Sequence, residues 1–376
     1  MPPLHDLRFR ANPLMELTQL ASLTDAQREP FRDLESDPDF YGLFVPQPPL
    51  TITIKSAPRQ TAELFRSLAA PAHLDRALLG DGDAAANIVD LVLDGILEIE
   101  RGDGFVSGAD ALPFLSAGAP DAGGVLSRRA LLHAQELETA DPRMLASALY
   151  RYNCIPLTPS WRSRFAGPEA ILAHVGAGRG VARKILNRDW SFSGETRGWL
   201  AWTPLLASRD ASASTYKLYV SPRPERIRDA FEILVRVLAA APAPFKLGNS
   251  AAGLLRADKL VAYFSTREQL DGVASAMRRE LAGCEAQGVP FAAALDESGL
   301  LSWGVDPPES ERVLRWQERD SWRFWIAQRL GGAMAFAKSA RTSAAAEPWR
   351  FAVARIQRLG VDVATWTPSA ALWRPS

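Results

Sequence analysis

The sequence predicts an α+β protein in which a mixed α/β domain follows an N-terminal helical, winged-helix-like region. Short runs alternate apolar and polar residues, as strands do, and longer segments repeat apolar residues at helical spacing. From residue 216 onwards the two patterns follow each other as strand, helix, strand, strand and helix. The 376 residues, of which 47% are hydrophobic and 23% charged, suffice for two or three domains with a sizeable core.

We expect three regions along the chain. Residues 1–125 form an N-terminal region with the winged-helix-like module, and a linker rich in Gly, Ala and Pro covers 115–125. Residues 126–210 form a helical, Trp-rich connecting region. Residues 211–376 form the mixed α/β domain, which ends in a helix near 321–339 and a tail.

Charge and composition exclude several classes of function. The 43 basic and 43 acidic residues cancel, which argues against non-specific binding to nucleic acid or to an anionic membrane. No signal pattern opens the chain and no run of 18 apolar residues occurs, so we expect a cytoplasmic protein. The two cysteines and four histidines are scattered without metal-ligand spacing, so we expect neither a metal nor another cofactor.

The N-terminal region contains the outline of a winged helix. Thr24 and Gln27 form a predicted capping box, and Thr51–Lys55 alternates as a short strand. Ala84–Leu93 suits a helix, and Ile96–Glu100 a strand that turns back through Arg101–Gly104. This order is similar to the small domains that hold leader peptides of ribosomally made natural products. A plain structural hairpin is the alternative interpretation.

The middle of the chain predicts one helix and then loops. Residues 126–150 repeat apolar residues at helical spacing. Gly176–Gly180 lacks both a preceding strand and the spacing of a phosphate-binding loop, so we expect a flexible turn there.

The region from residue 216 predicts strands at 216–221, 245–248 and 259–264, helices at 225–239 and 267–281, and a turn at 302–308. Because side chains alternate along a strand, Lys217 and Tyr219 share one face, opposite an apolar face. Lys246 stands alone in an apolar strand, and Arg256 precedes a strand that carries Tyr263.

Three cations and two phenols could therefore converge round one cleft, as a phosphorylated or otherwise anionic ligand requires. Burial and neighbouring positive charge can also convert a lysine into a base. The alternative is that the lysines are solvated and the tyrosines only pack.

The order of these motifs resembles a lyase lineage. Residues 217–222 read KLYVSP, residues 245–248 read FKLG and residues 256–264 read RADKLVAYF. This series resembles the HopA-type effector and lyase family, which is related to the phosphothreonine lyases and to the lyase domains of class III lanthipeptide synthetases. Those relatives share K-x-[HY]-x-S, F-K-[VL] and R-x-[DG]-K-[LFI]-[VI]-x-Y strands in this order. The resemblance covers about residues 214–330.

The resemblance implies a lyase-like domain that eliminates phosphate from phosphoserine or phosphothreonine. Lys246 would abstract the Cα proton, Lys217 and Arg256 would bind the phosphate or the developing enolate, and Tyr263 would line the site. Arg323 would complete the phosphate clamp. The phosphothreonine lyases have a histidine as general acid where this chain has Tyr219, so Tyr219 or Tyr263 substitutes, or the site binds without eliminating.

Two functions fit these features of the sequence. The first is a metal-independent lyase for a phosphorylated precursor peptide, in the modification of a ribosomally made peptide. It would need a separate kinase-like enzyme, because the sequence has no kinase signature. The second is a non-catalytic peptide-binding or scaffold protein of the same fold that partners such a kinase. A further possibility is an effector that is delivered into host cells and eliminates phosphate from another substrate.

Overall fold

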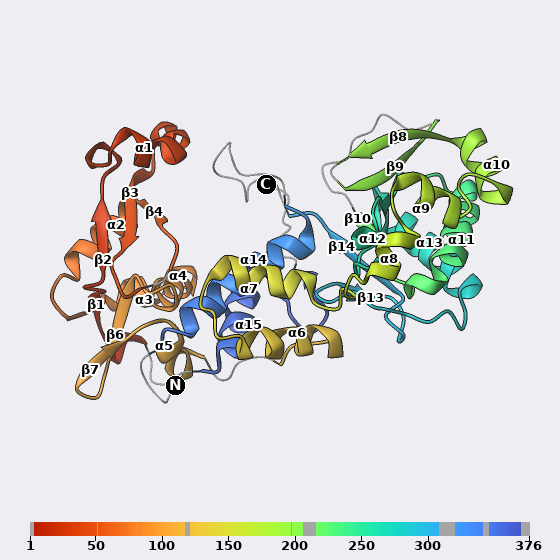
Figure 1. The fold of residues 1–376 in the computed structure, drawn as a ribbon. Helices are drawn as coiled ribbons and strands as arrows, with labels where there is room; N and C mark the ends of the chain where they lie inside the picture. The colour runs from red at the N-terminus through yellow and green to blue at the C-terminus, as the bar shows by residue number, and fades with distance from the viewer. Residues whose placement is uncertain are drawn as a thin grey trace.

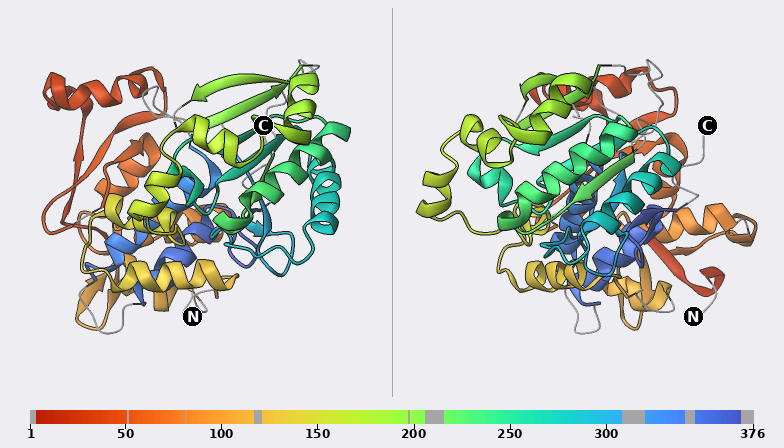
Figure 2. Two further views of the ribbon diagram at one scale, coloured as in Figure 1. Left: turned by 45° about the vertical axis from the view of Figure 1, so that its right-hand side comes forward. Right: turned by 90° about the vertical axis from the view of Figure 1, so that its right-hand side faces the viewer.

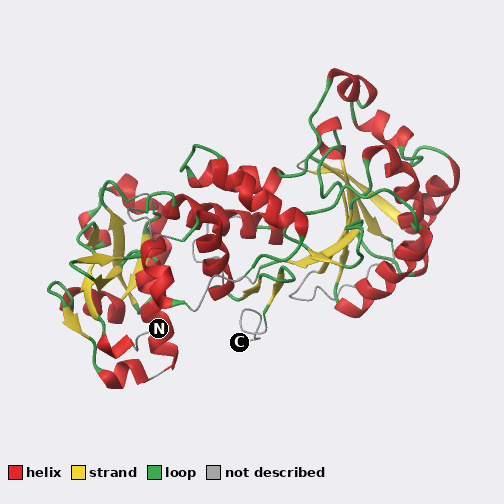
Figure 3. Ribbon diagram, turned by 90° about the horizontal axis from the view of Figure 1, so that it is seen from below, coloured by secondary structure: helices red, strands yellow, loops and turns green. Residues whose placement is uncertain are grey.

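The computed structural model describes residues 4–50, 52–80, 82–116, 121–196, 198–205, 216–307, 320–340 and 346–369. Three units follow one another across the molecule: an N-terminal unit, a helical bundle and a unit built on a large sheet (Figure 1). Figure 3 shows the strands at the two ends and the bundle helices between them. The fold is therefore α+β, as the sequence predicts.

The N-terminal unit contains two small antiparallel sheets. The first has the order β5-β1-β6-β7 and the second the order β2-β3-β4. Their strands are β1 (Arg8–Ala11), β2 (Met15–Thr18), β3 (Phe40–Pro46), β4 (Lys55–Pro58), β5 (Ala72–His73), β6 (Leu97–Arg101) and β7 (Gly104–Val106). The helices are η1 (Leu4–Asp6), η2 (Leu20–Ser22), α1 (Asp25–Arg28), η3 (Glu29–Ser36), α2 (Arg59–Ser67), α3 (Arg76–Gly80), α4 (Gly82–Leu93) and α5 (Gly108–Leu115).

The bundle is assembled from two distant parts of the chain. Helix α14 packs against α7 and α15, and α6 packs against α7 and α15. The bundle consists of α6 (Val125–Glu136), α7 (Pro142–Arg151), α14 (Trp322–Ala337) and α15 (Pro348–Arg358), followed by the hairpin β15 (Val361–Asp362) and β16 (Thr367–Pro368). Arg355 of α15 forms ion pairs with Asp90 and Asp94, which fix the N-terminal unit to the bundle.

The third unit is a seven-stranded antiparallel sheet of order β13-β14-β10-β12-β11-β9-β8. Its strands are β8 (Trp190–Thr196), β9 (Trp199–Pro204), β10 (Tyr216–Val220), β11 (Phe245–Gly248), β12 (Leu260–Phe264), β13 (Ala293–Ala294) and β14 (Leu301–Val305). Its helices are α8 (Pro159–Arg164), α9 (Pro168–His174), α10 (Gly180–Asp189), η4 (Pro224–Arg226), α11 (Ile227–Ala240), α12 (Ala251–Leu254) and α13 (Arg267–Glu280).

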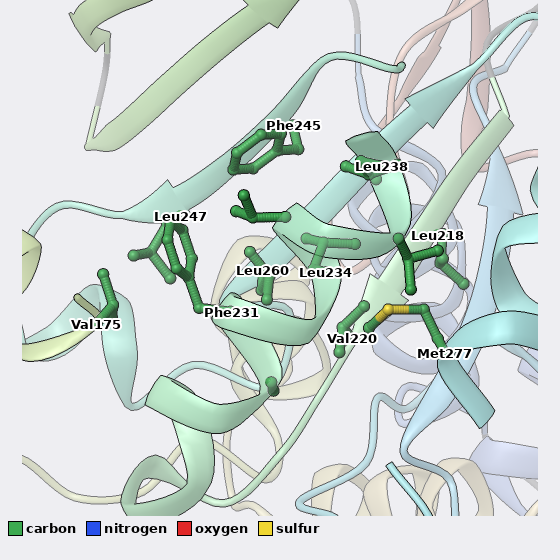
Figure 4. Close-up of a cluster of buried hydrophobic side chains, with 14 of the residues drawn as sticks. Val175, Leu218, Val220, Phe231, Leu234, Leu238, Phe245, Leu247, Leu260 and Met277 are labelled. Atoms are coloured by element: carbon green, nitrogen blue, oxygen red, sulfur yellow. The ribbon is translucent and has the colours of Figure 1, made fainter. Parts of the chain in front are cut away.

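One face of the large sheet is closed by helices. Leu218, Val220 and Leu260 point from their strands into a core that also contains Phe231 of α11 and Met277 of α13 (Figure 4). These helices lie on the side of the sheet away from the bundle (Figures 1 and 2). The opposite face is therefore the one that looks towards the bundle.

Many predicted elements are present. The capping box of Thr24 and Gln27 forms, and helix α4 is followed by the β6–β7 hairpin. The strands and helices expected between residues 216 and 281 occur within two residues of the predicted ends. None of the described helices combines the length and the apolar character that crossing a bilayer requires.

Three predicted elements differ. In place of a strand over Thr51–Lys55, residues 52–54 are irregular and β4 begins at Lys55; Thr51 lies outside the described residues. The helix expected over 126–150 is two helices, because Asp141 caps a new helix whose first residue is Pro142.

The turn expected at 302–308 is mostly strand β14. Its Gly304 fits beneath Trp322, where an added Cβ would lie 2.8 Å from the ring, so this glycine serves close packing and not a turn. Pro308 lies outside the described residues. The linker at 115–125 likewise falls partly outside them, at 117–120.

The units do not follow the expected boundaries. Strands β8 and β9, placed by sequence in a connecting region, are part of the large sheet. Helices α14 and α15, placed in the lyase-like domain, belong to the bundle. Sequence order cannot reveal this arrangement, because both contacts join segments that are far apart in the chain.

The contact between α7 and α14 depends on Gly331. A Cβ at this position would lie 2.6 Å from the backbone nitrogen of Ala146 and 2.8 Å from the carbonyl oxygen of Pro142. We predict that Gly331→Ala forces the two helices apart and lowers the free energy of unfolding by about 1–3 kcal/mol, measured by urea denaturation.

The neighbouring glycine is a matched control. A Cβ at Gly332 meets nothing within 4 Å. Gly332→Ala should therefore raise the free energy of unfolding by up to about 1 kcal/mol, because alanine favours a helix. Equal effects of the two substitutions would contradict the close approach at Gly331.

Candidate functional site

The sheet face that looks towards the bundle carries the predicted cationic residues. Strand β12 lies between β10 and β11, with Lys217 opposite Tyr263 and Lys246 opposite Val261. Because directly opposed residues share a face, Lys217, Tyr219, Lys246 and Tyr263 all project from this side. The alternation in the sequence predicts the shared face of Lys217 and Tyr219 only, and the pairing of the strands adds Lys246 and Tyr263 to it.

Lys246 lies between two aromatic rings. Its Nζ is 4.2 Å from the ring centre of Trp199 and 5.3 Å from that of Tyr263. No hydrogen bond or ion pair joins this Nζ to any residue that the structure describes. Burial, followed by the positive charges of Lys217 and Arg256, lowers the pKa of Lys246 from 10.5 to about 8. A tenth of the amine is then neutral at about pH 7.

Arg256 is held by a buried carboxylate. Its guanidinium donates to both carboxylate oxygens of Asp258 at 2.8 and 3.0 Å and to the hydroxyl of Tyr150 at 2.7 Å. The same guanidinium lies 4.8 Å from the ring centre of Trp199. Arg256 and Lys246 therefore border one aromatic ring, and the structure brings them to the same side of the sheet.

Asp258 also binds Arg323. The guanidinium of Arg323 lies 2.8 Å from Asp258 Oδ2 and donates to the carbonyl oxygens of Pro290 and Tyr150 at 3.1 and 2.9 Å. Burial opposes ionisation of Asp258, but Arg323 and Arg256 outweigh it and hold the pKa of this carboxyl well below its ordinary value.

Arg323 therefore lies beneath the cluster and not within it. Its side chain is 2% exposed and each of its nitrogens has a protein acceptor. The expectation that it completes a phosphate clamp does not fit this placement, because a phosphate could reach it only by displacing buried partners.

Lys217 is paired with a carboxylate. Its ammonium forms an ion pair with Asp306, and both side chains are nearly buried. The Lys217 Nζ also lies 5.6 Å from the ring centre of Tyr263. An anion that binds Lys217 must therefore compete with the Asp306 carboxylate.

The two tyrosines of the cluster differ in access. Tyr219 is 3% exposed and packs with Val261 and Val289, whereas Tyr263 is half-buried between the two lysines. Burial raises the pKa of both phenols above the ordinary value, so both remain protonated near neutral pH. Tyr263 is thus the phenol that can reach a ligand beside Lys246.

Several residues of the site could not be assigned from sequence. Trp199 and Tyr150 come from segments far from the motifs, and no local pattern identifies them. Asp258 lies inside the R-x-D-K motif, which is the signal that could have singled it out. Lys259 in the same motif is buried, and its Nζ donates to Pro222 and Gln287, so it supports the fold outside the cluster.

The cluster can bind an anion and accept a proton. Lys217 and Arg256 are the cationic side chains that an anion can bind, while burial of Lys246 makes a neutral amine accessible near physiological pH. Among the described residues, no three His, Cys, Asp or Glu side chains gather where they could hold a metal ion.

Asp258 should be essential for the stability of the site. We predict that Asp258→Asn lowers the free energy of unfolding by about 3–5 kcal/mol at neutral pH, because two guanidinium groups lose their shared carboxylate. Urea denaturation measures the change. Asp229→Asn, which breaks a half-exposed pair with Arg226, should cost less than about 1 kcal/mol.

The lowered pKa of Asp258 also makes the stability of the fold depend on pH. A carboxyl whose pKa is lower in the folded chain stabilises the fold above its unfolded pKa of about 3.9, and this stabilisation is lost as pH falls through the folded value. The free energies of unfolding of the parent protein and of Asp258→Asn should therefore become more alike as the pH falls below about 4. A constant difference would show that Asp258 is not ionised in the folded protein.

Comparisons with solved structures return similarities at 10–12% identity and with TM-scores below 0.5. No family model matches the chain, and no curated protein matches it. An effector protein from Pseudomonas syringae pv. tomato strain DC3000 is 10% identical with a TM-score of 0.39, over 64% of this chain and 95% of that one. One from Pseudomonas syringae pv. syringae strain 61 is 10% identical with a TM-score of 0.38, over 66% and 99%. The type III effector and phosphothreonine lyase OspF from Shigella flexneri is 12% identical with a TM-score of 0.29, over 40% and 85%.

Proposed function

We propose that this chain is a metal-independent lyase that eliminates phosphate from phosphoserine or phosphothreonine in a peptide. One observation carries the proposal: the amine of Lys246 has no hydrogen-bond partner among the described residues and has a pKa of about 8, beside Lys217 and Arg256. Such an amine can remove a proton next to bound negative charge.

The reaction would proceed without any added group. The Lys246 amine takes the Cα proton, the electrons of the Cα–H bond form the Cα=Cβ double bond, and the Cβ–O bond breaks. Phosphate leaves with the electron pair of that bond. The products are a dehydroamino acid in the peptide, inorganic phosphate and the Lys246 ammonium, which returns its proton to solvent.

Two cationic side chains would bind the phosphate group. Arg256 offers a planar guanidinium fixed by Asp258 and Tyr150, and Lys217 offers an ammonium once phosphate displaces Asp306. Tyr263, protonated and half-buried, can donate a hydrogen bond to the departing oxygen. We propose Tyr263 for this role over Tyr219, because Tyr219 is packed beneath the cluster.

The peptide would be phosphorylated by a separate kinase-like enzyme. We extend the proposal to a ribosomally made precursor peptide, handled in the cytoplasm. Helix α4 and the β6–β7 hairpin would form the recognition module of the N-terminal unit. That unit is attached to the bundle, and the bundle in turn contacts the candidate site through Tyr150.

Replacing the base separates binding from elimination. Lys246→Arg keeps positive charge but has no accessible neutral form, because a guanidinium does not deprotonate. We predict that this variant still binds a phosphothreonine peptide yet eliminates phosphate at least about 10²-fold more slowly. Mass spectrometry follows the loss of phosphoric acid, and fluorescence anisotropy follows binding.

Lys184→Arg is the matched control, since Lys184 is exposed on α10, and it should eliminate at the parent rate. Parent-rate elimination by Lys246→Arg would exclude Lys246 as the base. Binding without elimination in the parent protein would favour the second function, a peptide-binding or scaffold protein. Two features are compatible with that function: Asp306 competes with an anion for Lys217, and Tyr219 stands where the phosphothreonine lyases have a histidine.

The rate should follow the neutral fraction of Lys246. That fraction grows as pH rises, so kcat/KM should increase about tenfold per pH unit between roughly pH 6.5 and 7.5 and become constant above the pKa of about 8. A stopped assay of released phosphate measures the profile. A rate that is flat over this range would assign the proton transfer to another group.

A further inference from the structure

A groove of about 720 Å³ runs along the free edge of the large sheet, next to the candidate site. Roughly 300–1,000 Å³ is the usual range for a ligand-binding cavity. One wall is the sheet edge and the other is the start of α6 with the β15–β16 loop. Its lining includes Val125, Ala292, Ala294, Ser302, Thr365 and Thr367.

Ser302 connects the groove to the cationic cluster. It lies opposite Tyr219 on β10, and Gly304, two residues later, lies opposite Lys217. Ser302 is 2% exposed, and its Oγ has no hydrogen-bond partner among the residues that the structure describes. A buried hydroxyl without a partner costs free energy unless a ligand or water satisfies it. The groove therefore contains an unused polar group close to where phosphate would bind.

The sheet edge can pair with an extended chain. Ala293 pairs with Trp303 and Ala294 with Ser302, and Leu295 donates to Leu301. Backbone groups in an antiparallel strand point alternately to its two sides, so those of Ala294 point away from β14. Ala294 is exposed, and no strand among the described residues pairs with that side of β13. A substrate backbone can thus add to this edge.

The start of α6 favours an acidic side chain. Its N-cap is Gly124, which offers no capping side chain, and the N–H groups of Val125, Leu126 and Ser127 make no hydrogen bond to the described residues. A helix N-terminus attracts negative charge. The nearby carboxylates of Asp296 and Asp362 already accept from backbone N–H groups of their own loops.

We propose that this groove holds the peptide chain of the substrate beside its phosphorylated residue. One segment of the backbone pairs with the outer edge of Ala294, the segment between it and the phosphorylated residue passes over Ser302 and bonds to its hydroxyl, and an acidic side chain lies at the N-terminus of α6. The inference rests on the proposed lyase function and adds a preference for extended, acidic phosphopeptides.

The backbone contact is tested on the substrate. Short synthetic phosphothreonine peptides carry a single N-methyl group, which is moved along the chain one residue at a time. We expect KM to rise about tenfold at one position on the side that occupies the groove, with little change at its two neighbours. A uniform effect of N-methylation at all positions would overturn the edge pairing.

The acidic contact is tested with a second peptide set and a matched pair of variants. One glutamate is moved through an otherwise neutral phosphopeptide, and KM should fall about fivefold at one position. Val125 is 68% exposed, so Val125→Glu and Val125→Gln should both fold. Val125→Glu should abolish the glutamate preference by repulsion, whereas Val125→Gln should retain it.

The outcomes separate the two proposals. Elimination that depends on neither N-methylation nor glutamate position would refute the groove while leaving the lyase intact. If peptide binding depends on the N-methyl position and on the glutamate position but phosphate is never released, the peptide-binding groove is supported and the lyase function is refuted. Loss of the preference in Val125→Gln as well would assign it to packing and not to charge.

Discussion

The carboxylate of Asp258 is buried, and it remains ionised only because two guanidinium groups flank it. One belongs to Arg256, next to the sheet, and the other to Arg323 at the start of α14. Removing any one of these charges leaves the others uncompensated in a dry environment, where an unpaired charge is costly. The position of Arg256 beside Lys246, and hence the electrostatics of the whole site, therefore depends on the docking of the bundle against the sheet.

Trp199 imposes a second constraint on the lysine. Its ring lies against both Lys246 and Arg256, so it keeps water from one side of the amine while its π face favours a cation. The two effects oppose each other, since dehydration favours the neutral amine. A pKa near 8 means that both protonation states are accessible, which a base that must take up and release a proton requires.

The sequence predicts local features of this protein well. The alternation of residues around Lys217 and Tyr219 predicts that both side chains lie on one face of the sheet. The order of the three motifs predicts three neighbouring strands. Contacts between distant segments leave no such pattern: Tyr150 joins the site from α7, and β8 and β9 extend the sheet. Arg323 shows the limit most clearly, because the residues next to it in the sequence do not distinguish an arginine on the surface from one that is buried in an ion pair.

The interrupted bundle has a consequence for how the chain folds during synthesis. Helices α6 and α7 leave the ribosome before the entire sheet unit, yet the surface they bury belongs to α14 and α15, which follow it. Leu131, Leu145 and Leu149 must therefore stay without their final partners while the sheet forms. Closing so long a loop is slow, and the exposed apolar helices are prone to aggregate meanwhile. The site at the sheet–bundle junction can consequently be completed only after α14 has been made, so a nascent chain carries no finished site.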